Sequence, residues 1–231
     1  MYKRQQLELK TILDNIEKAK FDDNIIAIYI NSPFVNAGLS QTEEIRNKLL
    51  EFKKTGKPMI AYSEVYSIKN YFLASVADKI YMNPLGVIDH KGLSATVMFF
   101  KGLLEKLNID LQIFRLGKFK SAIEPFTLDK MSNENREQLK LMLNSINNNI
   151  LDSISSQRQI PFEVVKKHAN QLTLNSAEIC LEKGYVDHLI YEDQVEDSLI
   201  AIGTNEKLKT ISIKGYSSVK SKNKDISSCL L

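Results

Sequence analysis

Apolar runs alternate with segments of helical periodicity through the first half of the chain. Ile25–Ile30 is almost entirely apolar and rich in β-branched residues, which is typical of a strand buried on both faces. Met59–Tyr62 and Ile80–Met82 have the same character, and the segments between these runs, about 40–56 and 68–77, repeat apolar residues at helical spacing. Strand–helix–strand units of this length predict a parallel sheet with right-handed crossovers.

The pattern beyond this sheet becomes mainly helical. A short apolar strand at Gly86–Ile88, a helix around 99–107 and a strand at 109–114 come first. Residues 132–158 then form one long helical pattern, for which Ser132 is the expected N-cap. We therefore predict the α/β fold class, with a parallel β-sheet, strand–helix crossovers and a long helix in the second half of the chain.

Two further helices begin with capping sequences. Ser40 stands three residues before Glu43, and this S-x-x-E spacing predicts that Ser40 caps the helix that follows the first strand. Ser176 opens a similar capping box, and the helix after it is expected to end at Gly184.

A change to polar composition gives the expected domain boundary. Residues 209–213 alternate like an edge strand, and beyond Gly215 serine and lysine dominate. We expect one α/β domain over 1–213 and a polar tail or linker without regular structure over 214–231. The apolar runs are too short to span a bilayer, so we expect this chain by itself to be soluble.

Composition and motifs exclude several classes of function. The 231 residues carry a net charge of only +3, which gives no reason to expect a nucleic-acid partner. The scattered glycines form no phosphate-binding loop, so no cofactor is predicted. His90, His168 and His188 lack the spacing of metal ligands, and two cysteines, Cys180 and Cys229, are too few for a disulfide framework.

The segment Phe114–Phe126 carries two lysines among aromatic and aliphatic residues. A lysine taken out of water loses part of its preference for the charged form, and a neutral amine is a general base. One of the two lysines, Lys118 or Lys120, is therefore a candidate catalytic residue, and the second cation beside it would favour its neutral form. The alternative is an amphipathic turn whose lysines extend to water.

Several motifs of the chain, taken together, resemble the signal peptide peptidase A (protease IV) family, in particular the N-terminal repeat of its long, two-repeat form. The motifs that carry this resemblance are Asn31-Ser32-Pro33, Lys57-Pro58, Tyr71–Ile80, Asn83-Pro84, Gly86-Val87, the lysine segment Phe114–Phe126, Met131-Ser132, Leu172-Thr173 and Val186-Asp187. The lysine segment is the specific one, and the resemblance covers residues 7 to about 213.

This resemblance implies a crotonase/ClpP-like fold and a serine endopeptidase that degrades cleaved signal peptides with a Ser-Lys dyad. Lys120 matches the lysine of the dyad, which takes the proton of the serine and later returns it to the leaving amine. In the long form the serine comes from the C-terminal repeat. Membrane association through an anchor outside this chain, facing the cell exterior or periplasm, is also implied, as is a homo-oligomer in the complete protein.

The chain departs from the family pattern where a single-repeat member carries its nucleophile. Ile68 stands at the place of the serine, and Ser67 lies one residue earlier. At a helix start, a shift by one residue rotates the side chain about 100° around the helix axis. Tyr66 and Lys69 replace the flanking glycines. We therefore expect the chain to supply Lys120 to a composite site, to lack the serine, and to be inactive alone.

The expected partners are a serine-bearing C-terminal repeat or second chain, and peptide substrates. One alternative is a non-catalytic assembly subunit or degenerate remnant of such a protease, with the helix from Ser132 as its interface. Another is a crotonase-type enzyme acting on acyl thioesters, which the lack of a glycine-rich oxyanion loop disfavours. Glu124 is expected one turn from Lys120, where its charge would favour the protonated amine.

Overall fold

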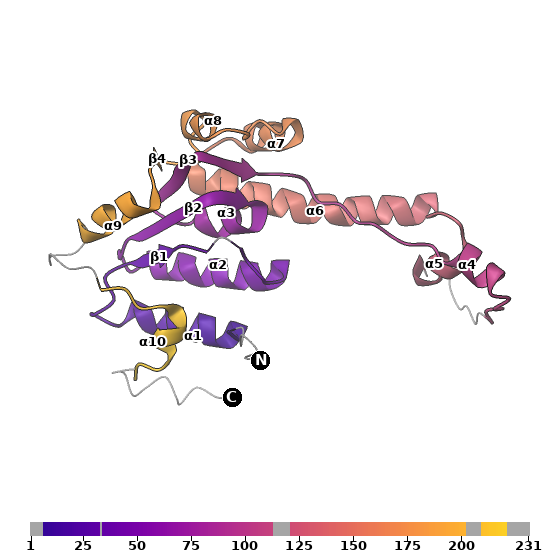
Figure 1. The fold of residues 1–231 in the computed structure, drawn as a ribbon, viewed down its shortest axis with the longest axis horizontal. Helices are drawn as coiled ribbons and strands as arrows, with labels where there is room; N and C mark the ends of the chain where they lie inside the picture. Colours follow the sequence, from indigo (N-terminus) through magenta and orange to yellow (C-terminus); the bar gives the residue numbers. More distant parts are fainter. Residues whose placement is uncertain (1–6, 33, 113–120, 202–208, 221–231) are drawn as a thin grey trace. The chain divides into compact units, whose positions relative to one another are not determined.

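A four-stranded parallel sheet forms the centre of the fold (Figure 1). The computed structural model describes residues 7–32, 34–112, 121–201 and 209–220. The strands follow the order β1 (Ile28–Ile30), β2 (Met59–Ser67), β3 (Lys79–Asp89) and β4 (His188–Leu189). All three pairings are parallel, with Ile30 opposite Ala61, Tyr62 opposite Tyr81 and Met82 opposite Leu189. This topology confirms the predicted α/β class.

Helices connect the strands and make up most of the remaining described chain. They are α1 (Leu9–Lys20), α2 (Leu39–Lys53), α3 (Ile68–Ala74), α4 (Lys101–Lys106), the 3₁₀ turn η1 (Ser121–Ile123), α5 (Glu124–Thr127), α6 (Asn133–Arg158), α7 (Phe162–Gln171), α8 (Ala177–Glu182), α9 (Glu192–Ile200) and α10 (Ile213–Ser217). Ser132 caps α6 by accepting a hydrogen bond from Asn135 N at 3.2 Å, and Ser176 caps α8. Both caps confirm the sequence prediction.

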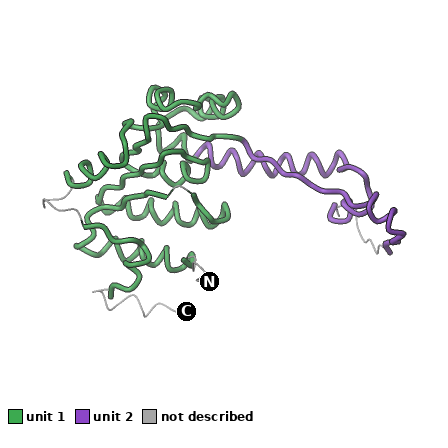
Figure 2. The backbone as a smooth tube through the Cα atoms, in the orientation of Figure 1, with its two compact units in different colours: residues 1–91, 153–231 green, residues 92–152 purple. Residues whose placement is uncertain are grey.

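The described chain divides into two compact units, which Figure 2 shows in green and purple. Unit 1 comprises residues 1–91 and 153–231, and unit 2 comprises residues 92–152. Unit 1 contains the sheet, and its largest fully buried side chains include Phe52, Met59, Tyr62, Tyr66, Tyr71, Ile80, Met82 and Tyr185. Unit 2 contains α4, η1, α5 and most of α6.

The strands differ in length and burial from the sequence prediction. The residues of β1 are only partly buried, because β1 lies at an edge of the sheet and not in its interior. β3 runs without a break through Asn83-Pro84, so the two short strands predicted there are one. Gly86 makes this possible: a Cβ atom at this position would lie 2.4 Å from the carbonyl oxygen of Glu64, beside an irregularity in the β2–β3 register.

Three local predictions differ from the structure at segment ends. α2 is capped at Gly38 and not at Ser40, because the Gln41 side chain accepts a hydrogen bond from Gly38 N at 3.0 Å. The described residues 109–112 and 209–212 are not strands. The regular structure also continues past the expected boundary at residue 213, since α10 buries Tyr216 against α1.

Candidate active site

The junction between β2 and α3 is where a catalytic serine would be expected in a single-repeat relative. β2 ends at Ser67, and α3 begins at the next residue. Ser67 is the N-cap of α3, and its Oγ accepts a hydrogen bond from Asn70 N at 3.3 Å. Such a cap satisfies one of the backbone N–H groups that a helix start leaves without an intrahelical acceptor. The hydroxyl of Ser67 therefore has a structural role at this helix start.

The first turn of α3 carries no nucleophile at its first two positions. Ile68 is aliphatic and partly buried. The Nζ atom of Lys69 donates a hydrogen bond of 3.0 Å to the carbonyl oxygen of Ala37, in the loop after β1. The next backbone N–H of that loop, Gly38 N, is bound by the Gln41 side chain. An oxyanion hole needs N–H groups aimed at the substrate. Gly38 N does not serve this purpose here, because it donates to the Gln41 side chain.

Buried polar contacts fix the position of α3 within unit 1. The Asn70 side chain donates to Ser63 Oγ at 3.3 Å, and the Tyr71 hydroxyl donates to the carbonyl oxygen of Tyr185 at 2.6 Å.

The buried side chain of Arg46 also binds α3. It donates to the Phe72 carbonyl oxygen, to Ser75 Oγ and to the Ser153 carbonyl oxygen. Burial lowers the pKa of Arg46 to about 10, and these acceptors compensate its buried charge. These hydrogen bonds tie α3 to β2, α2 and the segment around Tyr185.

The predicted catalytic residue Lys120, and its neighbour Lys118, lie outside the described residues. The structure describes the chain from Ser121 onward, where η1 leads directly into α5. Glu124, expected beside Lys120, binds the start of α6 through Ser132 and Asn135. The sequence had no signal for this contact, because it joins α5 to the residues at the start of α6.

His90 is the most unusual titratable group among the described residues. Its side chain is 3% exposed, and neither ring nitrogen has a hydrogen-bond partner in the described part of the chain. Burial, and then the charge of His168, lower the pKa of His90 to about 4. His168 itself contacts the Tyr185 hydroxyl through Nδ1 at 3.1 Å. His90 is therefore neutral at pH 7, and no nucleophile is paired with it.

The remaining candidates from the sequence are dispersed. Burial raises the pKa of the Cys180 thiol to about 11, so this thiol is not a ready nucleophile. Within the described ranges, no three histidine, cysteine, aspartate or glutamate side chains are grouped to hold a metal ion.

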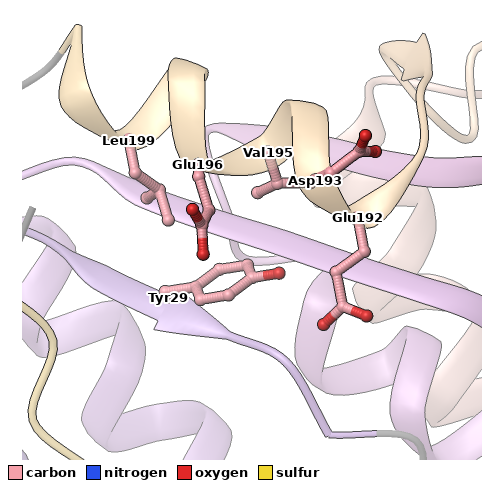
Figure 3. Close-up of a pocket in the computed structure, with 6 residues that line it drawn as sticks. All are labelled: Tyr29, Glu192, Asp193, Val195, Glu196 and Leu199. Atoms are coloured by element: carbon pink, nitrogen blue, oxygen red, sulfur yellow. The ribbon is translucent and has the colours of Figure 1, made fainter.

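One hollow lies between β1 and α9, and the sequence did not predict it. It measures about 150 Å³ and is lined by Tyr29, Glu192, Asp193, Val195, Glu196 and Leu199, as Figure 3 shows. The Tyr29 hydroxyl is buried, and burial followed by the charge of Glu192 raises its pKa. Glu192 and Asp193 suit the first turn of α9, where the helix dipole favours acidic side chains. The lining contains no serine, threonine, cysteine or lysine that could form a Ser-Lys type of site.

The parallel sheet, its crossover helices and the β2–α3 junction define an α/β domain of the crotonase/ClpP-like kind. Residues 51–202 match the family model described as Peptidase family S49, so the chain belongs to this peptidase family.

The curated relatives support this assignment. The chain is 31% identical to "Serine protease SPPA, chloroplastic" of Arabidopsis thaliana over 93% of its own length and 32% of the relative's. It is 33% identical to "Protease 4" of Haemophilus influenzae over 87% of its length and 34% of the relative's, and 34% identical to "Protease 4" of Salmonella typhi over 84% and 33%. The chain thus spans about a third of the length of these relatives.

No helix among the described residues has the length and apolar character needed to cross a bilayer.

Proposed function

We propose that this chain is the N-terminal repeat of a Ser-Lys endopeptidase that degrades cleaved signal peptides. In this proposal Lys120 is the general base, and the nucleophilic serine comes from a C-terminal repeat or a second chain. The observation that carries the proposal is the β2–α3 junction, where Ile68 is the first residue of the helix and the hydroxyl of Ser67 caps it. A match over only a third of each long relative agrees with one repeat of a longer enzyme.

The chemistry assigned to Lys120 follows from the family resemblance. The neutral amine accepts the proton of the serine hydroxyl as the serine oxygen attacks the scissile carbonyl carbon. The ammonium then gives this proton to the leaving nitrogen as the peptide C–N bond breaks, and water hydrolyses the acyl-enzyme. No histidine takes part, which agrees with the dispersed positions of His90, His168 and His188 in the sequence.

The need for a partner is supported by the surface of unit 2. α4 and α5 contain no buried residue. Large apolar side chains of this unit are 46–68% exposed: Met98, Leu103, Leu107, Phe126, Leu141 and Met142. Exposed apolar side chains in this number are typical of a surface that another protein covers. We assign this surface to contacts in the complete enzyme, which we propose is a homo-oligomer.

The test is to co-express this chain with the serine-bearing repeat of a long-form relative and to assay cleavage of a signal-peptide substrate. We expect activity and labelling by a fluorophosphonate probe on the partner's serine, both lost in Lys120→Ala. Lys130→Ala, an exposed lysine of the same unit, is the matched control and should retain activity. Robust labelling of any serine in this chain alone, Ser67 and Ser121 included, would contradict the proposal.

A non-catalytic assembly subunit is the second candidate, because the same exposed apolar surface of unit 2 would serve it. In that case the co-expressed pair would associate, but its activity would be unchanged by Lys120→Ala. For the complete enzyme we further propose, by family resemblance, action at a membrane surface, on the exterior or periplasmic side.

A further inference from the structure

The hollow between β1 and α9 is built on the apolar core of unit 1. Val195 and Leu199 of α9 are buried and belong to one apolar cluster with Tyr62 of β2. Tyr29 of β1 packs against this cluster, and Figure 3 shows Leu199 pointing from α9 toward the ring of Tyr29. The hollow of about 150 Å³ therefore offers apolar walls along which an alkyl chain can lie.

Acidic side chains supply the polar part of the lining. Glu192, Asp193 and Glu196 line the hollow, and none of the three forms an ion pair within the described ranges. Figure 3 shows Glu192 and Glu196 extending from α9 toward Tyr29, whereas Asp193 points away from the ring. The Asn31 side chain donates to Glu192 Oε1 at 2.8 Å and so orients this carboxylate. The described residues thus leave the negative charge of the hollow unbalanced.

Two tyrosine hydroxyl groups beside these carboxylates are buried without a hydrogen-bond partner in the described part of the chain, those of Tyr29 and Tyr62. Tyr62 is only 2% exposed. Burial raises the pKa of both tyrosines, and the charge of Glu192 raises both further, so the two hydroxyls lie in the field of the same carboxylate. A buried hydroxyl without a partner costs free energy, and a ligand that binds it removes this cost.

These features favour an organic cation over a metal ion. Among the residues that the structure describes, no three acidic, histidine or cysteine side chains are grouped to hold a metal. A primary ammonium carries three N–H donors, enough for two carboxylates and a tyrosine oxygen. Its alkyl chain suits the apolar walls, and the face of a tyrosine ring attracts a cation. A lysine side chain combines these properties.

We propose that the hollow between β1 and α9 binds the lysine side chain of a peptide. Glu192 and Glu196 bind the ammonium, and the Tyr29 ring and the apolar side chains of α9 contact the alkyl chain. The source of the peptide rests on the proposed function: a signal peptide begins with a positively charged n-region, which supplies such a side chain. The hollow then selects substrates by the charge of this region.

The isolated chain tests the site without a partner. An end-blocked tetrapeptide with two lysines, and its counterpart with two norleucines, are titrated into the isotope-labelled chain and followed by NMR. The lysine peptide should shift the amide signals of residues 29 and 192–199 in a saturable way, and the norleucine peptide should not. Glu192→Gln and Glu196→Gln should each weaken binding by about twofold to fivefold, since exposed ion pairs are individually weak.

Asp197→Asn is the matched control, because it removes the same charge from an exposed position of α9 outside the lining. It should weaken binding less than either glutamate variant, and the NMR spectrum of each variant reports whether it is folded. The absence of saturable shifts with the lysine peptide overturns the proposal. An equal loss in Asp197→Asn also overturns it, because the peptide would then respond only to the overall charge of the helix.

The co-expressed enzyme tests the source of the peptide. A signal-peptide substrate with norleucine in place of its n-region lysines should have a severalfold higher KM with kcat unchanged, and the double variant Glu192→Gln/Glu196→Gln should remove this difference. An equal KM for the two substrates in the wild-type pair overturns the role in substrate selection. Saturable lysine binding by the isolated chain, together with an inactive wild-type pair, supports the binding site and overturns the composite enzyme.

Discussion

The Nζ atom of Lys69 lies 3.0 Å from the carbonyl oxygen of Ala37, and this hydrogen bond joins the first turn of α3 to the loop after β1. The family resemblance predicts that these two segments carry the nucleophile and the oxyanion donors in a single-repeat peptidase. In this chain a lysine side chain bridges them. The bridge gives the junction a structural role that does not need catalysis.

Lys69→Met is expected to destabilise the chain by about 1 kcal/mol, because it leaves the Ala37 carbonyl without its charged donor. Urea denaturation followed by circular dichroism measures this change. The exposed Lys54→Met serves as the control and should shift the free energy of unfolding by less than about 0.5 kcal/mol. Equal effects of the two substitutions would show that the bridge contributes nothing specific.

Ile68→Ser is expected to leave the isolated chain without peptidase activity. The substitution supplies a hydroxyl at the nucleophile position, but Gly38 N remains bound to Gln41 and Lys69 still bridges to the loop. A tetrahedral intermediate would therefore lack Gly38 N as a donor for its oxyanion. Fluorophosphonate labelling and a peptide cleavage assay check this outcome. Efficient labelling at position 68 would show that this junction is a complete site lacking only its serine.

His90 should make stability depend on pH in the acidic range. The pKa of His90 is about 4 in the folded chain against 6.5 as its ordinary value, so the unfolded state binds more protons between these values. The contribution of neutral His90 to the free energy of unfolding is complete above pH 6.5 and is lost as the pH falls toward 4. At pH 5 the free energy of unfolding is lower by about 2 kcal/mol for this reason.

Urea denaturation at pH 7 and pH 5 measures this dependence in wild type and in His90→Leu. The leucine variant should lose the acid-sensitive part, because an apolar side chain suits a buried site where the imidazole has no partner among the described residues. His188→Gln, at an exposed position in β4, is the control and should keep the wild-type slope. An unchanged slope in His90→Leu would assign the acid sensitivity to other groups.

Tyr216→Phe is expected to loosen α10 from α1. The Tyr216 hydroxyl donates to Asp22 Oδ2 at 2.8 Å, and Lys18 Nζ lies 3.8 Å from the centre of its ring. Removal of one hydrogen bond costs about 1 kcal/mol and leaves the ring contact in place. Hydrogen exchange of residues 213–217 should therefore become faster while exchange in β2 is unchanged. Tyr191→Phe, an exposed tyrosine, is the control.

The elements recovered from sequence were those with a strong local pattern. The buried run at Met59–Tyr62 and the long helix after Ser132 are both set by side chains close together in the chain. The continuity of β3 was missed, because Asn83-Pro84 has the local character of a strand end. It depends on the close approach of Gly86 to the backbone of Glu64 on the neighbouring strand.

The candidate site also has features that the local sequence shows and features that only the folded structure shows. The residue types at the start of α3, Ile68 and Lys69, were evident from the sequence, and the family resemblance predicts a serine and a glycine there in a single-repeat member. The partner of Lys69 was not evident, because Ala37 lies 32 residues earlier in the chain. The same holds for His90, whose isolation from hydrogen-bond partners within the described chain depends on how the surrounding elements pack.

The sequence by itself determined the parallel α/β class, the peptidase resemblance and the residue types at the β2–α3 junction. Periodicity, capping and motif spacing are local properties, and local sequence specifies them. Tertiary structure alone decided what those residues contact: Lys69 with Ala37, and Glu124 with the start of α6. The first contact joins residues 32 positions apart and the second joins two successive helices, and the geometry of both exists only once these elements have packed.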